Sequence, residues 1–320
     1  MQNSVPVNRY RSYNAYLKEL FGERVQKVPL DAGLSCPNRD GTLSRSGCIY
    51  CDRKGSGTGA MIDRSRSIEE QISTGISRAR RRYGARKFIA YFQSFTNTYA
   101  APDHLKSLYD AALSPPGVVG LSVATRPDCM DIEILKLLCS YRERCLVWVE
   151  LGLQSAHDET LKRIGRGHDV AAFERAVVSA SRSQLNVCAH VILGLPGEDR
   201  AMMRETARYL ARTPVNGVKI HLLYVVRGTP LADLYEKGEF RCLERGEYAD
   251  LVVDFLERLP SEMVVQRLTG DPFGAELIAP AWAKEKAANL NLIRKRMEER
   301  KSWQGKNHVE STVGRPGTGS

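Results

Sequence analysis

Short apolar segments rich in β-branched residues alternate along this chain with segments of helical period, and this alternation constrains the fold more than any other feature. The apolar segments span residues 26–33, 87–93, 117–125, 145–153, 186–195 and 217–225. Near-continuous apolar runs of this length are typical of parallel strands covered on both faces. Ser67 and Glu70 form a capping-box pattern before one helical segment, and Asp131 and Asp169 are placed to cap two others.

Alternating strands and helices predict right-handed βαβ crossovers and therefore a parallel sheet. About six βα units can be counted, two fewer than a closed barrel needs. The predicted fold class is α/β, a partial (β/α)6 TIM-like barrel with a C-terminal helical extension; a doubly wound sheet is the alternative. We expect an N-terminal extension over 1–26, the barrel over 27–260, an extension with a basic helix over 261–305, and a disordered tail over 306–320.

Polar residues follow the predicted strands at the points where these strands end. The sequences are QSFTNTY at 93–99, TRPD at 125–128, LQS at 153–155 and GLPGED at 194–199, and a cysteine-rich loop follows the first strand. Because the carboxyl ends of parallel strands meet at one rim, where barrel enzymes carry their chemistry, we expect these groups to converge there.

The loop after the first strand contains three of the eight cysteines, Cys36, Cys48 and Cys51, among glycines, serines and charged residues. Structural zinc would need a fourth ligand nearby, yet no histidine lies between Cys36 and Cys51, and the next one downstream is His104. A thioredoxin-type redox pair would use Cys48 and Cys51 and leave Cys36 unexplained. The spacing therefore favours a three-thiolate iron–sulfur cluster over zinc, which stays open.

The charge balance is basic. Lys and Arg number 47 against 37 Asp and Glu, a formal net charge of +10. Two runs, 77–87 and 294–306, concentrate the excess. A polyanionic partner such as RNA is compatible with this balance, because phosphates attract Lys and Arg, whereas solvated helix faces are the simpler interpretation of either run alone.

The segment over 1–20 has no apolar signal core, and no run of about 18 apolar residues occurs anywhere. We therefore expect a cytoplasmic protein with reduced cysteines and no membrane partner.

Several motifs together resemble one known family. They are C-x11-C-x2-C with the aromatic Tyr50 before the last cysteine, YFQSFTNTYAP, HVILGLPGE, CPNRDGT, GSGTGA and RLTGDPFGAELIAPAW. The chain resembles radical S-adenosylmethionine (SAM) enzymes, specifically a small stand-alone branch related to the elongator catalytic subunit, from about Tyr10 to Trp303. The first cysteine gap is longer than in the commonest C-x3-C-x2-C pattern, a departure that this branch shares.

The resemblance implies a [4Fe–4S] cluster held by Cys36, Cys48 and Cys51, with SAM on the fourth iron. It also implies reductive cleavage of SAM to a 5′-deoxyadenosyl radical, with an electron donor such as flavodoxin or ferredoxin. Tyr50 is grouped with the cofactor-binding residues on the same ground.

The remaining SAM contacts also follow from the resemblance. Thr96 and Asn97 would hydrogen-bond the methionyl amino group, and Arg166 would pair with the carboxylate. Gln154 matches a position that contacts SAM in related enzymes. Each residue also has an ordinary structural interpretation, such as the end of a strand or a surface charge.

Two further residues are assigned to SAM by the same resemblance. His190 stands where a relative has an acidic ribose ligand, and Gly194 would let the backbone approach the adenine. A histidine in an apolar strand is more often a satisfied core residue. Glu150, a carboxylate inside another apolar strand, should be paired or functional, and Arg126 with Asp128 either lines the substrate end or forms a turn.

The family relation favours tRNA as substrate, at the wobble uridine on which the elongator subunit acts. No counterpart of that subunit's acetyltransferase domain is recognised. A radical SAM enzyme acting on a small metabolite or a protein side chain is one alternative. A non-enzymatic zinc- and RNA-binding protein is the other.

Overall fold

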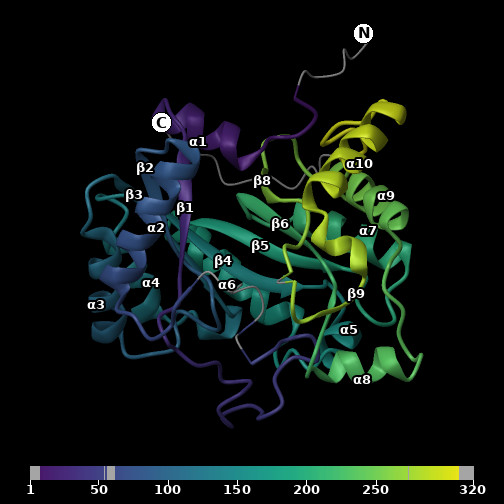
Figure 1. Ribbon diagram of the computed structural model, residues 1–320, viewed down its shortest axis with the longest axis horizontal. Helices are drawn as coiled ribbons and strands as arrows, with labels where there is room; N and C mark the ends of the chain where they lie inside the picture. The colour runs from purple at the N-terminus through teal and green to yellow at the C-terminus, as the bar shows by residue number, and fades with distance from the viewer. Residues whose placement is uncertain (1–7, 54, 56–61, 273, 310–320) are drawn as a thin grey trace.

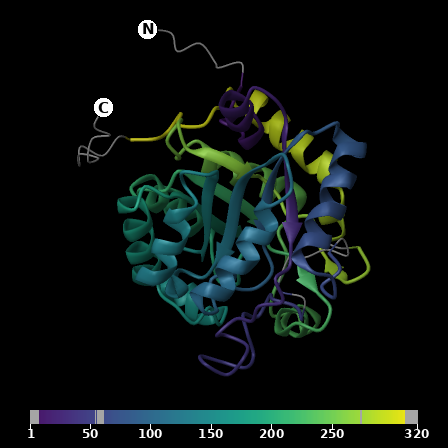
Figure 2. The ribbon, with the colours of Figure 1, turned by 90° about the vertical axis from the view of Figure 1, so that its left-hand side faces the viewer.

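The computed structural model describes residues 8–53, 55, 62–272 and 274–309. Seven parallel strands form one sheet in the order β1-β2-β3-β4-β5-β6-β8 and curve into an open half-barrel (Figures 1 and 2). The strands are β1 (Val25–Leu30), β2 (Lys87–Phe92), β3 (Val118–Thr125), β4 (Leu146–Gln154), β5 (Asn186–Leu193), β6 (Gly217–Leu222) and β8 (Val264–Arg267). The predicted partial barrel is confirmed, and its six expected strands are all present.

β8 is the element that the sequence pattern did not predict. It has four residues and ends in the polar pair Gln266–Arg267, so it lacks the apolar run by which the other strands are recognised. It pairs in parallel with β6 and lies within the segment 261–305, so this segment contributes a strand to the main sheet.

Helices cover the outer face of the sheet. They are α2 (Ile68–Tyr83), α3 (Pro102–Leu113), α4 (Ile132–Ser140), α6 (Val170–Arg182), α7 (Arg200–Ala211) and α9 (Arg245–Leu256). Two shorter helices, α5 (Asp158–Arg163) and α8 (Pro230–Glu236), instead pack together in a separate apolar cluster beside the cysteine loop. The predicted caps are confirmed: the Ser67–Glu70 box is complete, and Asp131 and Asp169 each accept a backbone hydrogen bond. The smaller elements are the 3₁₀ turns η2 (Pro127–Cys129) and η3 (Ala281–Lys284) and the antiparallel pair β7 (Val225–Val226) and β9 (Leu277–Ala279).

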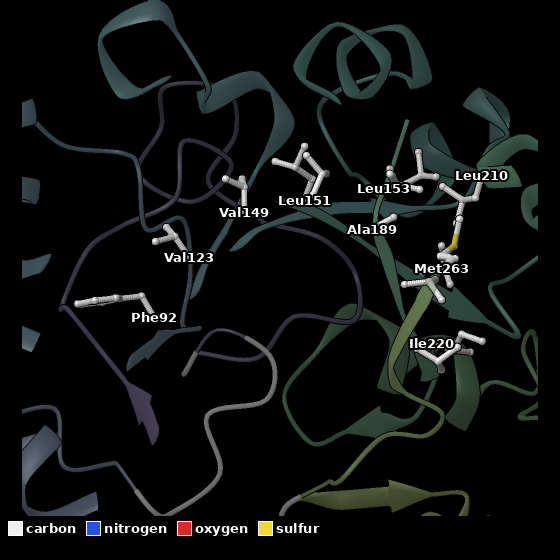
Figure 3. Packing of buried hydrophobic residues seen from close by; sticks show 14 of the residues in the cluster. Phe92, Val123, Val149, Leu151, Leu153, Ala189, Leu210, Ile220 and Met263 are labelled. Atoms are coloured by element: carbon white, nitrogen blue, oxygen red, sulfur yellow. The ribbon is translucent and has the colours of Figure 1, made fainter. Parts of the chain in front are cut away.

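The hydrophobic core lies between the outer face of the sheet and these helices (Figure 3). On β4, the outward-facing Val149, Leu151 and Leu153 are fully buried in it. Burying each such side chain contributes about 1.5–3 kcal/mol. Alternate residues of a strand point to opposite faces, so Glu150 and Gly152 point into the barrel.

The N-terminal ends of the strands are closed by α1 (Tyr13–Phe21). Tyr13 and Leu17 of α1 pack inside the barrel in one apolar cluster with Val25 and Trp148. The Tyr13 and Trp148 rings meet edge to face with their centroids 5.9 Å apart. α1 and the cysteine loop lie at opposite ends of the molecule in both ribbon views, so α1 closes the end of the barrel that lies away from the cysteine loop.

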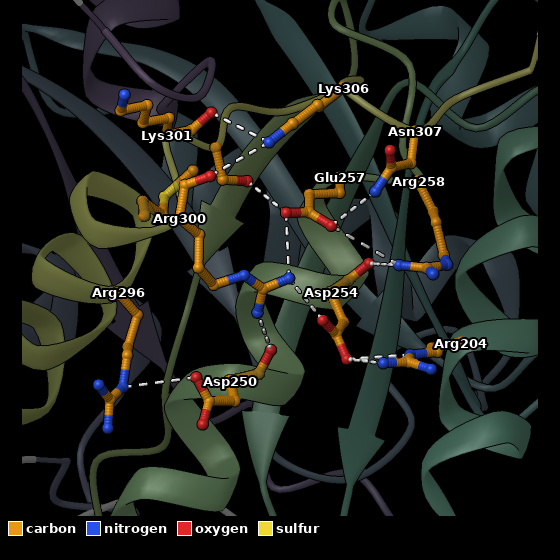
Figure 4. Close-up of polar contacts among 12 residues, drawn as sticks. Arg204, Asp250, Asp254, Glu257, Arg258, Arg296, Arg300, Lys301, Lys306 and Asn307 are labelled. Atoms are coloured by element: carbon orange, nitrogen blue, oxygen red, sulfur yellow. Dashed lines mark hydrogen bonds and ion pairs between the residues drawn. The ribbon is translucent and has the colours of Figure 1, made fainter.

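The basic C-terminal helix α10 (Lys286–Glu299) packs on α9, and it buries Ile293 and Met297. An ion-pair network fixes the chain that follows (Figure 4): Asp254 accepts from Arg204 at 2.7 Å and from Arg300 at 2.7 Å. Packing is therefore the established role of this helix.

The tail predicted over 306–320 begins with four described residues, and Asn307 donates to the Glu257 carboxylate at 2.7 Å. Residues 310–320 lie outside the described part of the chain. None of the described helices is both long enough and apolar enough to cross a bilayer.

Candidate functional site

One cavity opens at the C-terminal rim of the barrel, and its lining comes from the cysteine loop and from the ends of six strands. Eight of the ten residues assigned from sequence line it. They are Cys36, Cys48, Tyr50, Cys51, Thr96, Gln154, Arg166 and His190. Asn97 and Gly194 do not. The cysteine loop and the groups that follow β2, β3 and β4 converge at this rim as expected, whereas none of residues 194–199 lines the cavity.

The cysteine loop presents its sulfur atoms to hydrogen-bond donors. Asn38 Nδ2 lies 3.6 Å from Cys48 Sγ, Arg166 Nη1 lies 3.7 Å from the same sulfur, and Arg39 Nη1 lies 3.4 Å from Cys51 Sγ. Amide and guanidinium N–H groups are also the donors that hydrogen-bond the sulfur atoms of metal-bound cysteines. The donor set therefore fits a thiolate-bound group.

The three thiols are not gathered around one point. Among the described residues, no group of three His, Cys, Asp or Glu side chains is close enough to hold a single metal ion. A [4Fe–4S] cluster binds its thiolates on separate irons, so it does not need three sulfur atoms around one ion.

Backbone hydrogen bonds tie the cysteine loop to two other segments. Ile49 N–H donates to Ile164 C=O at 3.0 Å, and Leu231 N–H, at the start of α8, donates to Ile49 C=O at 2.9 Å. Thr229 caps α8 through its hydroxyl. The segment 227–235 thus packs against the loop at the barrel mouth.

Arg166 is buried beside the cysteines. Its Nη2 donates to Gly152 C=O at 2.9 Å, and its Nε has no partner among the described residues. A Cβ at Gly152 would lie 2.5 Å from that Nη2, so the glycine is what admits the guanidinium. Burial opposes the charge, but Tyr50 and the Cys48 thiol raise the pKa of Arg166.

Gln154, at the end of β4, has a φ of 74°, which is left-handed and strained for a non-glycine residue. Such strain is concentrated at functional sites. Thr96 is fully buried, and its hydroxyl has no partner within the described structure. Local structure therefore explains neither the backbone conformation of Gln154 nor the unpaired hydroxyl of Thr96, and both residues line the cavity.

Asn97 and Gly194 lie outside the cavity lining, and each has structural contacts of its own. Asn97 Nδ2 donates to the carbonyl groups of Ser94 and Ala124, each at 2.9 Å, which fixes the turn after β2. Gly194 has a φ of 88°, and a Cβ there would lie 2.9 Å from the side chain of Leu243. Close packing and backbone conformation account for this glycine without a ligand.

His190 faces the cavity from β5, but its Nε2 lies 2.6 Å from Glu150 Oε2. Burial, reinforced by the Lys219 charge, lowers the pKa of His190 to about 4, so the ring is neutral at pH 7. A neutral ring that donates to a carboxylate through Nε2 has only Nδ1 left, and Nδ1 accepts. The expected ribose contact is thus restricted to an acceptor role.

Arg126 and Asp128 form a turn, as one interpretation of their motif expects, and of the two only Arg126 is among the residues that line the described cavity. Their side chains form an ion pair at 2.7 Å within the η2 turn. The guanidinium of Arg126 also lines the cavity and donates to Arg166 C=O at 2.8 Å.

Sequence reasoning missed four polar residues of the barrel interior, Lys27, Lys219, His221 and Arg267. Lys219 and His221 alternate with apolar residues in β6. A polar residue at every second position of an apolar strand indicates an inward-facing polar row, and this signal was available.

Comparison with known proteins identifies the family. The radical SAM superfamily model matches residues 39–210, and the model of the radical SAM C-terminal domain matches residues 215–299. The Bacillus subtilis protein YtqA is 43% identical over 298 residues, covering 93% of this chain and 92% of YtqA. The Escherichia coli protein YhcC is 37% identical over 301 residues, covering 94% of each chain.

Solved structures agree on the fold. An N-terminally deleted Elp3 from Methanocaldococcus infernus superposes with a TM-score of 0.64 at 20% identity, covering 88% of this chain and 64% of that one. Methylornithine synthase (PylB) gives a TM-score of 0.53 at 14% identity, covering 91% of this chain and 86% of that one. The chain belongs to the radical SAM superfamily and is an enzyme of that class, with the superfamily's C-terminal domain following its core.

Proposed function

We propose that this radical SAM enzyme acts on tRNA, at or near the wobble uridine, and that Cys36, Cys48 and Cys51 hold its cluster. The observation that carries the proposal is the single cavity in which these cysteines meet Arg166 at the C-terminal rim. When bound, a [4Fe–4S] cluster supplies the electron that cleaves SAM into methionine and a 5′-deoxyadenosyl radical.

The chain's own residues would bind and orient the cofactors. Asn38 and Arg39 would hold the cluster-binding sulfurs in place through the N–H groups that they direct at Cys48 and Cys51. Arg166, with its unpartnered Nε in the described structure, would pair with the SAM carboxylate. Thr96 and Gln154 would supply the remaining polar contacts. The surrounding barrel would exclude water from the radical.

The tRNA assignment has two supports. The tRNA uridine(34) acetyltransferase of Methanocaldococcus infernus is 31% identical over 157 residues, covering 48% of this chain. Exposed arginines at the end of α2, Arg81 and Arg82, form part of a basic face suited to phosphates. The alignment covers only 29% of that relative, so acetyl transfer is not carried over. The proposed enzyme would work in the cytoplasm with a reductant such as flavodoxin or ferredoxin.

The test begins with anaerobic reconstitution, dithionite reduction and chromatography for 5′-deoxyadenosine. We expect wild type to form it and Cys48→Ala to lose it, because the variant lacks one cluster ligand. Cys139→Ala, a cysteine on α4 outside the cavity, is the matched control and should retain it. A Cys48→Ala variant that still cleaves SAM would contradict the cluster assignment.

The substrate is tested separately, by comparing tRNA nucleosides from wild-type and deletion strains. A nucleoside that changes on deletion and is restored by the wild-type gene, but not by Cys48→Ala, supports tRNA. Unchanged nucleosides, with SAM cleavage insensitive to added tRNA, would favour a small metabolite or a protein side chain.

A further inference from the structure

A charged layer crosses the barrel interior between the α1 plug and the cavity. The Glu150 carboxylate is its centre: it accepts from Lys27, from Lys219, from Ser122 Oγ at 2.5 Å and from His190 Nε2 at 2.6 Å. Burial alone would raise the pKa of Glu150, but the lysines hold it well below its usual range. Two ammonium groups thus share one carboxylate, and His190 is neutral, so the layer keeps one excess positive charge.

A register shift in β8 turns two more polar side chains toward this layer. The pairing moves from Val218–Val265 to Lys219–Arg267, so two residues of β8 face one of β6. A bulge of this kind re-aims side chains. Arg267 lies opposite the inward-facing Lys219, and Gln266 Oε1 accepts from Lys27 Nζ at 2.7 Å.

Gln266 and His221 bring polar groups that have no partner. Because a lysine ammonium only donates, the Gln266 amide oxygen faces Lys27 and its Nε2 points away. That Nε2, and His221 Nε2, are buried without a hydrogen-bond partner in the described structure. Burial also lowers the pKa of His221 well below its usual range, so its ring is neutral. An unmade buried hydrogen bond costs about 1–3 kcal/mol, which favours a ligand that completes it.

Arg267 supplies a full charge beside them. It lines the cavity, and its Nε donates to Thr269 C=O. No carboxylate of the described residues forms an ion pair with it. The phenols near it, Tyr91 and Tyr224, have pKa values raised by burial and stay neutral. Glu150 and Asp52 also line the cavity, but neither forms an ion pair with the Arg267 guanidinium in the described structure.

We propose that Arg267 and His221 form an anion subsite at the inner end of the cavity, which receives a carboxylate of the substrate, with Gln266 beside them outside the cavity lining. The planar guanidinium fork matches a carboxylate in two parallel hydrogen bonds. Arg166, near the cysteines, is a separate cation and remains for SAM. The inference rests on the proposed radical SAM chemistry, because it assigns a carboxylate-bearing group to the molecule that the radical attacks.

The test uses reconstituted holoenzyme with its cluster oxidised and SAM saturating, so that the SAM sites are filled and no turnover occurs. Acetate is the carboxylate added, acetamide is its neutral isostere and inorganic phosphate is the competing anion. Thermal unfolding is followed as each is titrated. We expect acetate to raise the melting temperature saturably and acetamide to have no such effect.

Arg267→Gln should weaken acetate binding about 10- to 100-fold, the loss expected for a charge-assisted pair. The matched control is Arg175→Gln, which removes an exposed arginine from the outer face of α6. Gln266→Glu is a second variant: the new carboxylate would pair with Lys27, so the fold should be retained while acetate binding is lost.

Equal effects of acetate and acetamide, or undiminished acetate binding in Arg267→Gln, would overturn the subsite. Tighter binding of phosphate than of acetate would overturn the carboxylate assignment. The tRNA proposal can fail independently of the subsite. If acetate binds through Arg267 but the tRNA nucleosides are unchanged in the deletion strain, the subsite is retained and the tRNA proposal is refuted. A changed nucleoside that carries no carboxylate before or after reaction keeps tRNA and refutes the subsite.

Discussion

Replacing Glu150 by glutamine tests whether the ion pairs of the charged layer in the barrel stabilise the folded protein. The change keeps the shape of the side chain but removes the carboxylate that pairs with both Lys27 and Lys219. The Glu150 side chain is 0% exposed and that of Lys219 is 6% exposed, so water replaces little of the lost interaction. Breaking a buried pair in this way costs about 3–5 kcal/mol of unfolding free energy.

The cost should depend on pH in a defined direction. Burial already lowers the pKa of Lys27 to about 8, against the opposing pull of Glu150, and removing Glu150 lowers it further. A lysine whose folded pKa lies below its unfolded value binds fewer protons when folded, so the free energy of unfolding rises with pH. In Glu150→Gln this rise begins at a lower pH than in wild type. The difference in the free energy of unfolding between wild type and Glu150→Gln should therefore become smaller as the pH rises from about 6 to about 9.

Urea unfolding at three pH values measures this difference. Glu159→Gln is the control, since it breaks an exposed pair with Lys162 and should change nothing measurable. The double variant Glu150→Gln/Lys219→Met removes one stranded charge and should regain part of the loss. A Glu150→Gln variant within about 1 kcal/mol of wild type at every pH, or a difference that widens with pH, would refute the reasoning.

Three other predictions concern residues around the cavity and the C-terminal network. Gly152→Ala places a methyl group against the Arg166 guanidinium, so SAM affinity measured by equilibrium dialysis should fall about tenfold or more. Arg39→Gln removes a cationic donor beside Cys51, so the reduction potential of the reconstituted cluster, followed by electron paramagnetic resonance, should become more negative. Asp254→Asn removes ion pairs to three arginines and should lower the unfolding free energy by about 2 kcal/mol in urea.

The Gly152→Ala prediction has a matched control, and each of the three predictions has an outcome that would contradict it. Gly246→Ala adds a methyl group into open space on α9 and should leave SAM affinity unchanged. Burial opposes the shift, but arginine hydrogen bonds lower the pKa of Asp254 to about 2. Its contribution is therefore present above the unfolded value of 3.8 and is lost as pH falls toward 2. Wild-type SAM affinity in Gly152→Ala, an unchanged potential in Arg39→Gln, or an Asp254→Asn loss that grows in acid would contradict these assignments.

The sequence predicted the strands, the caps and the convergence at the rim because these depend on local patterns. Apolar runs and capping residues such as Ser67 act within a few positions of the chain. β8 could not be predicted in this way, because its four residues become a strand only by pairing with β6. The same limit explains Asn97, whose amide binds Ala124 C=O, 27 residues away.

The charged layer around Glu150 shows a second limit of prediction from sequence. Sequence indicated that Glu150 should be paired or functional, but its partners come from β1, β5 and β6, far away along the chain. Only the closing of the sheet brings Lys27 and Lys219 to the same carboxylate. Long-range pairing of this kind has no local signature.

The buried ion pairs of the charged layer are also not the arrangement that would stabilise the fold most. Apolar residues of similar volume in place of a buried ion pair are often neutral or stabilising by about 1–4 kcal/mol. The neighbouring interior layer, where Tyr13 and Leu17 meet Trp148, shows that this barrel fills its interior with apolar side chains elsewhere. Lys27 and Lys219 share the single carboxylate of Glu150, so one of the two buried positive charges is not neutralised. Arg267, which has no ion pair among the described residues, lies next to them and adds a further unfavourable charge. An anion bound at Arg267 would remove that penalty. Acetate should therefore stabilise wild type more than the Gln266→Glu variant, because the side chain at position 266 of that variant already supplies the negative charge.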